Sequence, residues 1–380
     1  MKRAFIDYYN REGILPVRQN ISDPRFLATR SFLYSRLGAP LRFLKGIDII
    51  EFGPGGGFNA IATSKYKPRQ YYFIEGSTLG IEQLNEFIKR KLIHADKIKI
   101  FHSNFLDFKI VKKFDLVIAE GCIPGQIGPQ RYLEHISTFV SKDGLMIITT
   151  ISKSSVLSEM LRSLYALLIK DSYQNHETYV EFLEIEFATH LSNLGTNTRS
   201  IKDWVLDNIL NSCHKDGVNF SLLDAARVLP KFTLVSTSPT FFMDLTWYKK
   251  YKFNHSDFYK KLSYQTPRFE FFLLDSQIEE QDLPFVSNQE ASHVLNYIEY
   301  AFDEIFKVMR SNHAKINISQ VYIALENLVT ALPPEFNKTK SGILDFMHFL
   351  KSEKKVDYKF TEFKTFWGRG QQYVSFRRIE

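Results

Sequence analysis

The feature that most constrains this 380-residue chain is a mainly apolar segment, residues 49–52, which runs directly into a glycine-rich turn at residues 53–57. Apolar residues bounded by glycines predict a buried strand. Glycine has no Cβ atom, so the turn can take positive φ angles and a ligand can approach the backbone closely. A strand that ends in such a turn and leads into a helix is typical of α/β folds that bind the nucleoside end of a cofactor.

The spacing of the glycines distinguishes two kinds of cofactor. A dinucleotide-binding turn has the pattern G-x-G-x-x-G, and its third glycine would fall at Phe58. This chain instead has the pattern E-x-G-x-G-x-G, formed by Glu51, Gly53, Gly55 and Gly57. That pattern resembles motif I of the class I S-adenosylmethionine (SAM) methyltransferases.

Strands and helices are expected to alternate after the turn. A helix begins at Asn59 and ends before Pro68, because proline disfavours helical conformation in the residue before it. Aromatic and β-branched residues predict strands at residues 70–74, 97–102, 114–121 and 142–150, with helices at 80–92 and 131–140 between them. This alternation predicts a doubly wound, Rossmann-like α/β sheet, and the methyltransferase resemblance implies seven strands with inserted and C-terminal helices.

Polar side chains follow the ends of these strands, where the ligands of open α/β sheets bind. Glu75 ends the second strand and is placed to accept hydrogen bonds from two ribose hydroxyls. The resemblance implies that Asn104 and Phe105 meet adenine, with Asp107 as an alternative polar contact, and that Glu120 faces the methyl donor. The cofactor S-adenosyl-L-methionine is therefore expected to contact Gln19, Glu51, Gly53, Gly55, Gly57, Asn59, Glu75, Gly76, Asn104, Phe105 and Glu120.

Residues 1–45 are expected to form an N-terminal cap segment. Residues 8–23 mix aromatic and polar side chains without a clear period, and an amphipathic helix is expected at residues 25–37. In the methyltransferase resemblance such a segment folds over the cofactor, where Tyr9, Arg18 and Gln19 can reach the methionine carboxylate and amine. A cap without ligand contact explains the pattern equally well.

The methyltransferase domain is expected to span residues 46–250. Apolar residues at helical spacing predict a helical insertion at about 152–215, which could build the acceptor pocket or the surface of a homodimer. Residues 232–239 and 241–248 are expected to form the last two strands, as an antiparallel hairpin. Residues 251–380 are expected to be mainly helical. Their last segment, 366–378, predicts either a strand on the sheet or an acceptor contact through Arg369, Gln371 and Gln372.

Methyl transfer to a hydroxyl group needs a base near the carboxyl ends of the fourth and fifth strands. Glu120 is the first candidate, although it could instead bind the amino group of the cofactor. His135 is the second, although its helical position also suits a core or surface histidine. Cys122 is expected to be a buried small side chain, because transfer from a sulfonium needs no covalent intermediate, and Gln126 could orient the acceptor. No cluster of carboxylates and histidines has metal-ligand spacing, so no metal is expected.

The net charge of +7 and the pI near 9.0 raise the question of nucleic acid. The basic residues are spread along the chain, however, and the fourth strand does not end in the Asn-Pro-Pro-Tyr motif of methyltransferases that act on bases. Anionic glycans, sugar nucleotides or membrane-surface phosphates explain the charge equally well. No apolar run is long enough to span a bilayer and the amino terminus has no signal-peptide core, so a cytoplasmic protein is expected.

Over its length the chain resembles bacterial SAM-dependent methyltransferases associated with surface-polysaccharide biosynthesis. The resemblance implies an enzyme (EC 2.1.1.-) that methylates an oxygen of a glycan or a related small molecule. Carboxylate methylation of a peptide, a non-catalytic SAM-binding scaffold and an NAD-dependent oxidoreductase or epimerase are the alternatives, the last disfavoured by Phe58. The resemblance depends on residues 16–19, 198–199 with 203–205, 238–239 with 247–248, and 368–373.

Overall fold

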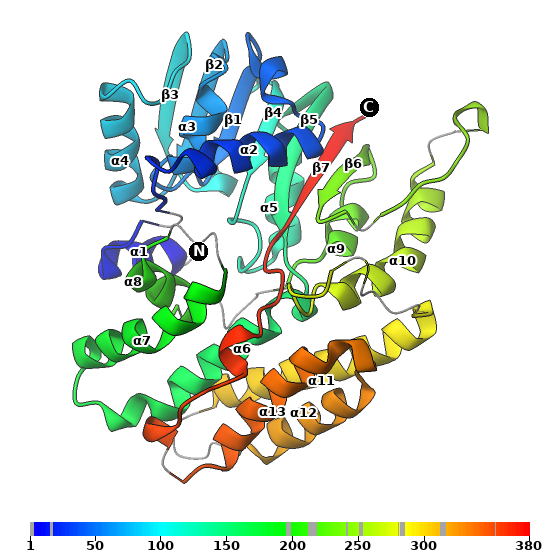
Figure 1. Ribbon diagram of the computed structural model, residues 1–380. Coiled ribbons are helices and arrows are strands. Elements are labelled where there is room, and N and C mark those ends of the chain that lie inside the picture. Colours follow the sequence, from blue (N-terminus) through cyan, green and yellow to red (C-terminus); the bar gives the residue numbers. More distant parts are fainter. Residues whose placement is uncertain are drawn as a thin grey trace.

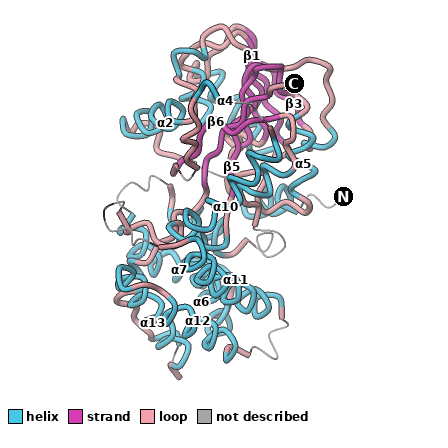
Figure 2. The backbone as a smooth tube through the Cα atoms, turned by 90° about the vertical axis from the view of Figure 1, so that its right-hand side faces the viewer, coloured by secondary structure: helices cyan, strands magenta, loops and turns pink. Residues whose placement is uncertain are grey.

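The computed structural model describes residues 4–15, 18–194, 199–211, 219–240, 242–250, 254–279, 281, 286–311, 317–353 and 355–380. These residues form a mixed β-sheet covered by helices, with a helical body below the carboxyl ends of its parallel strands (Figure 1). The view in Figure 2 shows the same division, with the strands gathered in the upper part and helices filling the lower part.

Seven strands form one sheet in the order β3-β2-β1-β4-β5-β7-β6. Strands β1 to β5 are parallel, and β7 is antiparallel to both of its neighbours. The order runs outward from β1 in both directions, which confirms the doubly wound, Rossmann-like α/β fold. The strands are β1 (Asp48–Phe52), β2 (Gln70–Glu75), β3 (Lys97–His102), β4 (Phe114–Ala119), β5 (Val140–Thr150), β6 (Phe232–Ser238) and β7 (Gln372–Arg378).

Helices cover both faces of the sheet, because its strands are apolar on both sides. Ile49 packs in the cluster on one face, and its neighbour Ile50 packs in the cluster on the other. The helices on the first face are α2 (Pro24–Arg36), which crosses in front of the strands in Figure 1, α3 (Phe58–Ser64) and α4 (Thr78–Lys89). Those on the second face are α5 (Pro129–Ser137), α9 (Leu222–Arg227) and part of α10 (His255–Phe272).

The hairpin predicted at residues 232–248 was wrong in its second strand. Residues 232–238 form β6, but residues 242–247 form a loop and residue 241 lies outside the described residues. The seventh strand is instead β7, whose Val374 and Phe376 are buried. The sheet therefore does not close near residue 250, since the region after 251 supplies a strand between β5 and β6.

The helical body is built from two stretches of chain that lie far apart in the sequence. One apolar cluster runs through the inserted helices and the C-terminal helices, and it extends to Trp367. None of the described helices is long and apolar enough to cross a membrane. Besides the lower part of α10, the helices are α6 (Lys153–Ile169), α7 (His176–Leu191), α8 (Ile201–Trp204), α11 (Asn288–Arg310), α12 (Ser319–Ala331) and α13 (Asn337–Lys351).

A fully buried arginine fastens the segment before β7 to the helical body. The guanidinium of Arg162, on α6, lies 3.6 Å from the ring centroid of Trp367 and donates to the backbone carbonyls of Phe363 and Phe366. A Cβ atom on the next residue, Gly368, would lie 2.2 Å from the carbonyl oxygen of Ser155, so only glycine fits there. These contacts fix the position at which the chain leaves the helical body and enters the sheet.

Candidate active site

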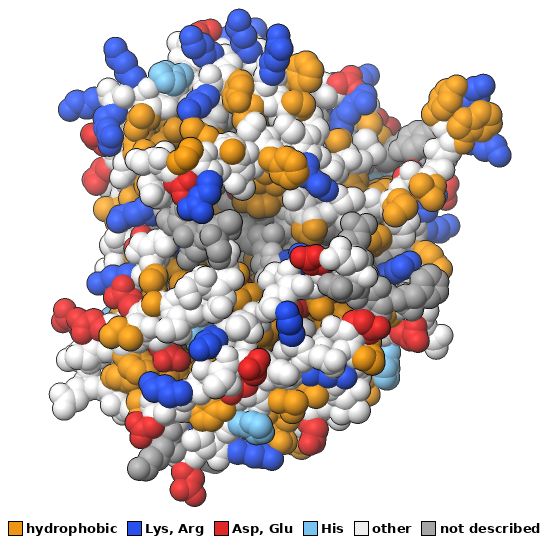
Figure 3. Space-filling view, viewed as in Figure 1, with side chains coloured by type: hydrophobic (Ala, Val, Ile, Leu, Met, Phe, Trp, Pro, Cys, Tyr) orange, Lys and Arg blue, Asp and Glu red, His pale blue; other side chains and the backbone are white. Residues whose placement is uncertain are grey.

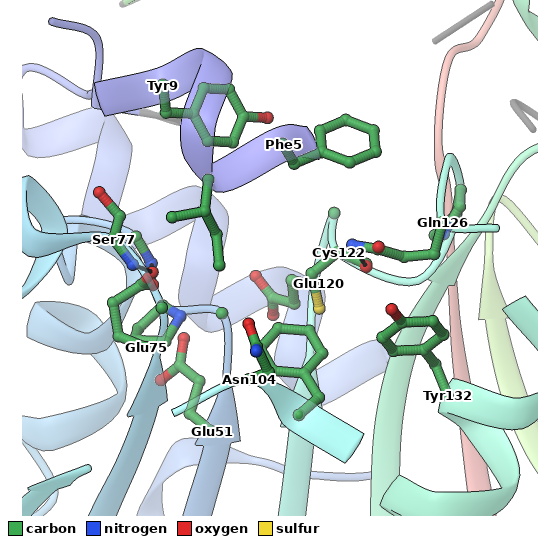
Figure 4. Close-up of a pocket in the computed structure, with 18 of the residues that line it drawn as sticks. Phe5, Tyr9, Glu51, Glu75, Ser77, Asn104, Glu120, Cys122, Gln126 and Tyr132 are labelled. Atoms are coloured by element: carbon green, nitrogen blue, oxygen red, sulfur yellow. Dashed lines mark hydrogen bonds between the residues drawn. The ribbon is translucent and has the colours of Figure 1, made fainter. Parts of the chain in front are cut away.

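A cavity of about 290 Å³ is lined by residues of the glycine turn and of the helical body. Figure 4 shows part of this lining. The cavity opens at the carboxyl ends of β1, β2 and β4, where the chain leaves β1 toward one face of the sheet, through α3, and leaves β4 toward the other face, through α5. Ligands of doubly wound sheets bind at this switch point. The volume is close to the lower end of the range for small-molecule sites.

The glycine turn has the backbone conformation that its sequence predicts. Gly53, Gly55 and Gly57 have φ angles of 66°, 55° and 77°, in the left-handed region that side chains rarely adopt. A Cβ atom on Gly53 would also lie 2.9 Å from the ring of Phe105. Gly53 and Gly55 line the cavity, whereas Gly57 is the N-cap residue just before helix α3 and is not among the lining residues.

Glu75 braces the glycine turn from the end of β2. Its carboxylate accepts a hydrogen bond of 2.9 Å from the backbone N–H of Gly55 and one of 2.7 Å from that of Ser77. Burial raises the pKa of Glu75 to about 7, although these N–H groups favour its charged form. The predicted ribose ligand therefore lines the cavity and also holds the turn in place.

Glu51 lies at the floor of the cavity, behind the turn. It is buried and accepts a hydrogen bond from the Tyr71 hydroxyl. Burial and the nearby charge of Glu120 raise the pKa of Glu51 to about 8. In the free protein this carboxyl group is therefore largely protonated at neutral pH.

Glu120 is surrounded by donors at the end of β4. Its oxygens accept two hydrogen bonds from Arg30, at 2.7 and 2.9 Å, one of 2.7 Å from the Tyr34 hydroxyl and one of 3.0 Å from the Asn59 amide. These hydrogen bonds hold the carboxylate in one orientation at the edge of the cavity. The geometry suits an orienting role for Glu120, and its role as a base stays a prediction.

Helix α1 (Ala4–Glu12) covers the part of the cavity that Gly76 and Asn104 line. A Cβ atom on Gly76 would lie 2.2 Å from Cδ1 of Ile6, so the helix lies directly over the end of β2. Figure 4 shows Phe5 and Tyr9 of α1 above the cavity, opposite Asn104. The sequence singled out Tyr9 but not Phe5 or Ile6, because a nine-residue segment has too few turns for its buried face to be read.

The wall opposite the glycine turn is polar and comes from the helical body and β7. Arg199 donates hydrogen bonds to Asp207 and Asn208, and all three line the cavity. Asp207 and Asn208 belong to a π-helical turn, Val205–Ile209, and π-helical turns occur frequently at functional sites. Gln371 and Tyr373 complete this wall. Gln371 is named from the sequence as a candidate acceptor contact, whereas Arg199, Asn208 and Tyr373 are not.

Several predicted residues lie away from the cavity. His135 contacts the backbone carbonyl of Phe108 at 3.0 Å through Nε2 and is not among the lining residues, and its catalytic role stays a prediction. Gln19 is also not among them. Arg369 donates to two backbone carbonyls and Gln372 donates to that of Gly370, so both support the backbone and only Gln371 reaches the cavity.

The charged side chains that line the cavity are mostly acidic. Among the described residues the only lining cation is Arg199, which is paired with Asp207. Arginines pair with Glu120 and Asp207, and Glu51 is largely protonated at neutral pH, so the lining becomes more favourable for a cationic ligand when Glu51 ionises. No group of three or more potential metal ligands occurs in the described parts of the chain. The lining carboxylates are Glu51, Glu75, Asp107, Glu120 and Asp207.

No protein-family model matches the chain, and no curated protein sequence matches it. Solved structures are similar at low identity. The N-methyltransferase NodS from Bradyrhizobium japonicum WM9, in complex with S-adenosyl-L-homocysteine, is 14% identical over 39% of this chain and 73% of its own, with a TM-score of 0.32. Magnesium protoporphyrin IX methyltransferase (ChlM) from Synechocystis PCC 6803, also with S-adenosyl-L-homocysteine, is 12% identical over 61% of this chain and 90% of its own, with a TM-score of 0.38.

The CcbJ methyltransferase from Streptomyces caelestis is 13% identical over 40% of this chain and 59% of its own, with a TM-score of 0.30. Values this low carry no argument about activity. The assignment to the Rossmann-like α/β class comes from the strand order and the antiparallel seventh strand of the chain itself.

Proposed function

We propose that this protein is a SAM-dependent methyltransferase that methylates an oxygen of a glycan or a related small molecule. The observation that carries the proposal is the acidic cavity beside the E-x-G-x-G-x-G turn. SAM has a positively charged sulfonium and an ammonium group, and both are attracted by a surface of this sign. When bound, it supplies an electrophilic methyl group.

Each part of the cofactor has residues suited to hold it. The adenine ring would lie between Phe105, Asn104 and Ile6, and the carboxylate of Glu75 would bind the ribose hydroxyls. Glu120, and Glu51 once it has lost its proton, remain for the positively charged end, which they would stabilise by charge. Two of the glycine-turn residues, Gly53 and Gly55, leave room for the ligand against the backbone.

The same contacts disfavour a nicotinamide dinucleotide. Its pyrophosphate would need free backbone N–H groups at the glycine turn and a neutral or positive surface. The N–H group of Gly55 already donates to Glu75, and five carboxylates line the cavity. Both facts support SAM over NAD.

The polar wall is suited to an uncharged acceptor that carries hydroxyl groups. The guanidinium of Arg199 faces Asp207 and Asn208, so little of its charge is left for an anion, while the amides of Asn208 and Gln371 can bind hydroxyls. Asp207 is the lining carboxylate on this side. We propose that it orients the acceptor hydroxyl and accepts its proton, with Arg199 holding its carboxylate in place, and that catalysis comes mainly from alignment.

Calorimetry with SAM, S-adenosylhomocysteine and NAD tests the cofactor. The protein is expected to bind the first two and not NAD, and Gly55→Arg is expected to abolish binding. Gly46→Arg is the matched control, because Gly46 also has a positive φ of 76° but has nothing within 4 Å of its Cβ position and does not line the cavity. Unchanged SAM affinity in Gly55→Arg would overturn the cofactor assignment.

Transfer of a labelled methyl group to sugars and to peptides with free carboxylates tests the acceptor. Asp207→Asn should lower kcat on a sugar acceptor at least tenfold while SAM affinity stays within about twofold, as expected for a base that acts only in the reaction. Methylation of peptide carboxylates would replace the glycan proposal. Tight SAM binding without transfer to any acceptor would favour the alternative of a non-catalytic scaffold.

A further inference from the structure

Residues 242–250, which we name the aromatic arm, project from the surface beside the first turns of α10 (Figure 1). Four large apolar or aromatic side chains within six residues are exposed: Met243 by 56%, Leu245 by 86%, Trp247 by 55% and Tyr248 by 75%. In Figure 3 the arm forms the projection at the upper right, where hydrophobic and basic side chains gather. Elsewhere among the described residues, exposed apolar side chains of this size are dispersed along the chain.

The arm is held in position by α10. The ring of Phe242 packs against that of Phe258, with 5.6 Å between centroids. The backbone N–H and carbonyl of Met243 bond to the side-chain amide of Gln265, at 2.9 and 2.8 Å. Lys261 donates a hydrogen bond of 2.7 Å to the Thr246 hydroxyl. The apolar side chains are thus presented on a braced support.

Basic residues accompany the exposed rings. The ammonium group of Lys249 lies 5.1 Å from the ring centroid of Trp247 and 5.8 Å from that of Tyr248, and Lys250 follows it. The one acidic residue of the arm, Asp244, is 3.5 Å from the ammonium group of Lys261. The positive charges of Lys249 and Lys250 therefore remain at the tip, beside the apolar side chains.

We propose that the aromatic arm docks the protein on the surface of an anionic lipid bilayer. Tryptophan and tyrosine favour the interface between water and lipid, and leucine can enter the acyl boundary. Lysines near an anionic surface add electrostatic attraction. The tip is a narrow projection, so it suits a soft lipid surface better than a flat protein interface, which needs roughly 1,000 Å² of buried area.

Tryptophan fluorescence offers a selective measurement on the intact protein. The other two tryptophans, Trp204 and Trp367, are buried, so Trp247 is the one whose surroundings change on docking. Vesicles of phosphatidylcholine and phosphatidylglycerol at three to one are expected to shift the emission to shorter wavelength and to sediment the protein. Vesicles of phosphatidylcholine alone are expected to bind at least tenfold more weakly.

Variants separate the contributions of apolar insertion and charge. Leu245→Ser with Trp247→Ser should weaken sedimentation with anionic vesicles at least tenfold, and Lys249→Glu with Lys250→Glu should remove the preference for anionic lipid. Val111→Ser is the control, because Val111 is exposed outside the arm and its loss should leave binding unchanged. All these side chains are exposed, so the circular dichroism spectrum and melting temperature should stay the same.

Failure of the intact protein to bind anionic vesicles would overturn the proposal. So would sedimentation-velocity data in which the intact protein is a dimer and the Leu245→Ser, Trp247→Ser variant is a monomer, since the arm would then contact a second copy. A monomer that binds anionic vesicles through the arm would support it.

Discussion

The guanidinium of Arg30 and the carboxylate of Glu120 are joined by two hydrogen bonds although 90 residues separate them in the chain. Both side chains are buried. Burial opposes the charge of Arg30, but Glu120 and the hydroxyls of Tyr34 and Tyr373 outweigh it and raise the pKa of Arg30 well above its usual value. The helix before the sheet thus places a permanent positive charge behind the proposed methyl-donor site.

Breaking this pair should be costly for the fold. Arg30→Met leaves the carboxylate of Glu120 buried without its counter-charge, and we expect the free energy of unfolding to fall by about 3 kcal/mol in urea titrations. Arg30→Met combined with Glu120→Gln should recover most of that loss, because no buried charge then remains. Equal or additive losses in the double variant would contradict this account.

The raised pKa of Glu51 predicts how stability depends on pH. The carboxyl binds its proton more tightly in the folded protein, with a pKa of about 8, than in the unfolded chain, with a value near 4.5. Its contribution to stability is therefore complete below about pH 4.5 and is lost as the pH rises through about 8, with a slope of at most ~1.4 kcal/mol per pH unit. Urea titrations at pH 5, 6.5 and 8 should show this decline, and Glu51→Gln should make it shallower, with the remaining decline due to groups such as Glu75, whose pKa is raised to about 7. The exposed Glu82→Gln variant should keep the wild-type profile.

The same group should couple SAM binding to proton release. A positively charged ligand beside Glu51 favours its ionised form, so binding at pH 7 should release a proton, and SAM affinity should rise between pH 6 and pH 8. Calorimetry at pH 7 in phosphate and in Tris, whose ionisation enthalpies differ, measures that proton. Glu51→Gln should abolish the difference between the buffers. A difference that persists in this variant would assign the proton to another group.

Helix α1 should contribute to cofactor affinity through its attachment to the helical body. The Tyr8 hydroxyl donates a buried hydrogen bond of 2.6 Å to the backbone carbonyl of Leu206. Tyr8→Phe removes a bond worth about 1 kcal/mol and should raise the Kd for SAM roughly fivefold. Tyr300→Phe removes a surface hydroxyl on α11 and should leave the Kd unchanged. Equal affinities in both variants would show that α1 does not cover the ligand.

Strand β7 should be essential to the sheet. Val374 is fully buried between β5 and β6, and Val374→Ser should lower the free energy of unfolding by about 3 kcal/mol. Arg377 lies on the same strand but is half exposed, with one surface ion pair to Asp143. Arg377→Ser should cost less than about 1 kcal/mol. A sheet that closed near residue 250 would make both variants nearly neutral.

Local signals were sufficient to predict the first five strands and the glycine turn. Strand β1 and the turn from Gly53 to Gly57 follow from apolar runs and glycine spacing, which depend on a few adjacent residues. The seventh strand could not be chosen in this way. Residues 241–248 and 372–378 have similar aromatic patterns, and only pairing across the sheet distinguishes them.

The site residues that lie at the ends of strands could be predicted from the sequence. Those that lie on the helices that cover the cavity could not. Glu75 and Asn104 follow strand ends and line the cavity as expected, whereas Asn208 belongs to a π-helical turn that no periodic pattern announces. Arg30 did leave a signal. Phe26, Arg30 and Tyr34 are spaced four apart, so they share one face of α2, and the structure shows that all three are buried. An arginine on an otherwise apolar helix face indicates a buried acidic partner.

The position of β7 also determines the order in which the strands of the sheet can pair during synthesis. Because the ribosome starts at the amino end, β5 and β6 are complete before the strand that joins them exists. The α10 to α13 helices are synthesised during that interval, while the facing edges of β5 and β6 have no partner strand. Chains aggregate by pairing through such exposed strand edges. Newly made chains should therefore depend on chaperones until residues 372–378 emerge and close the sheet.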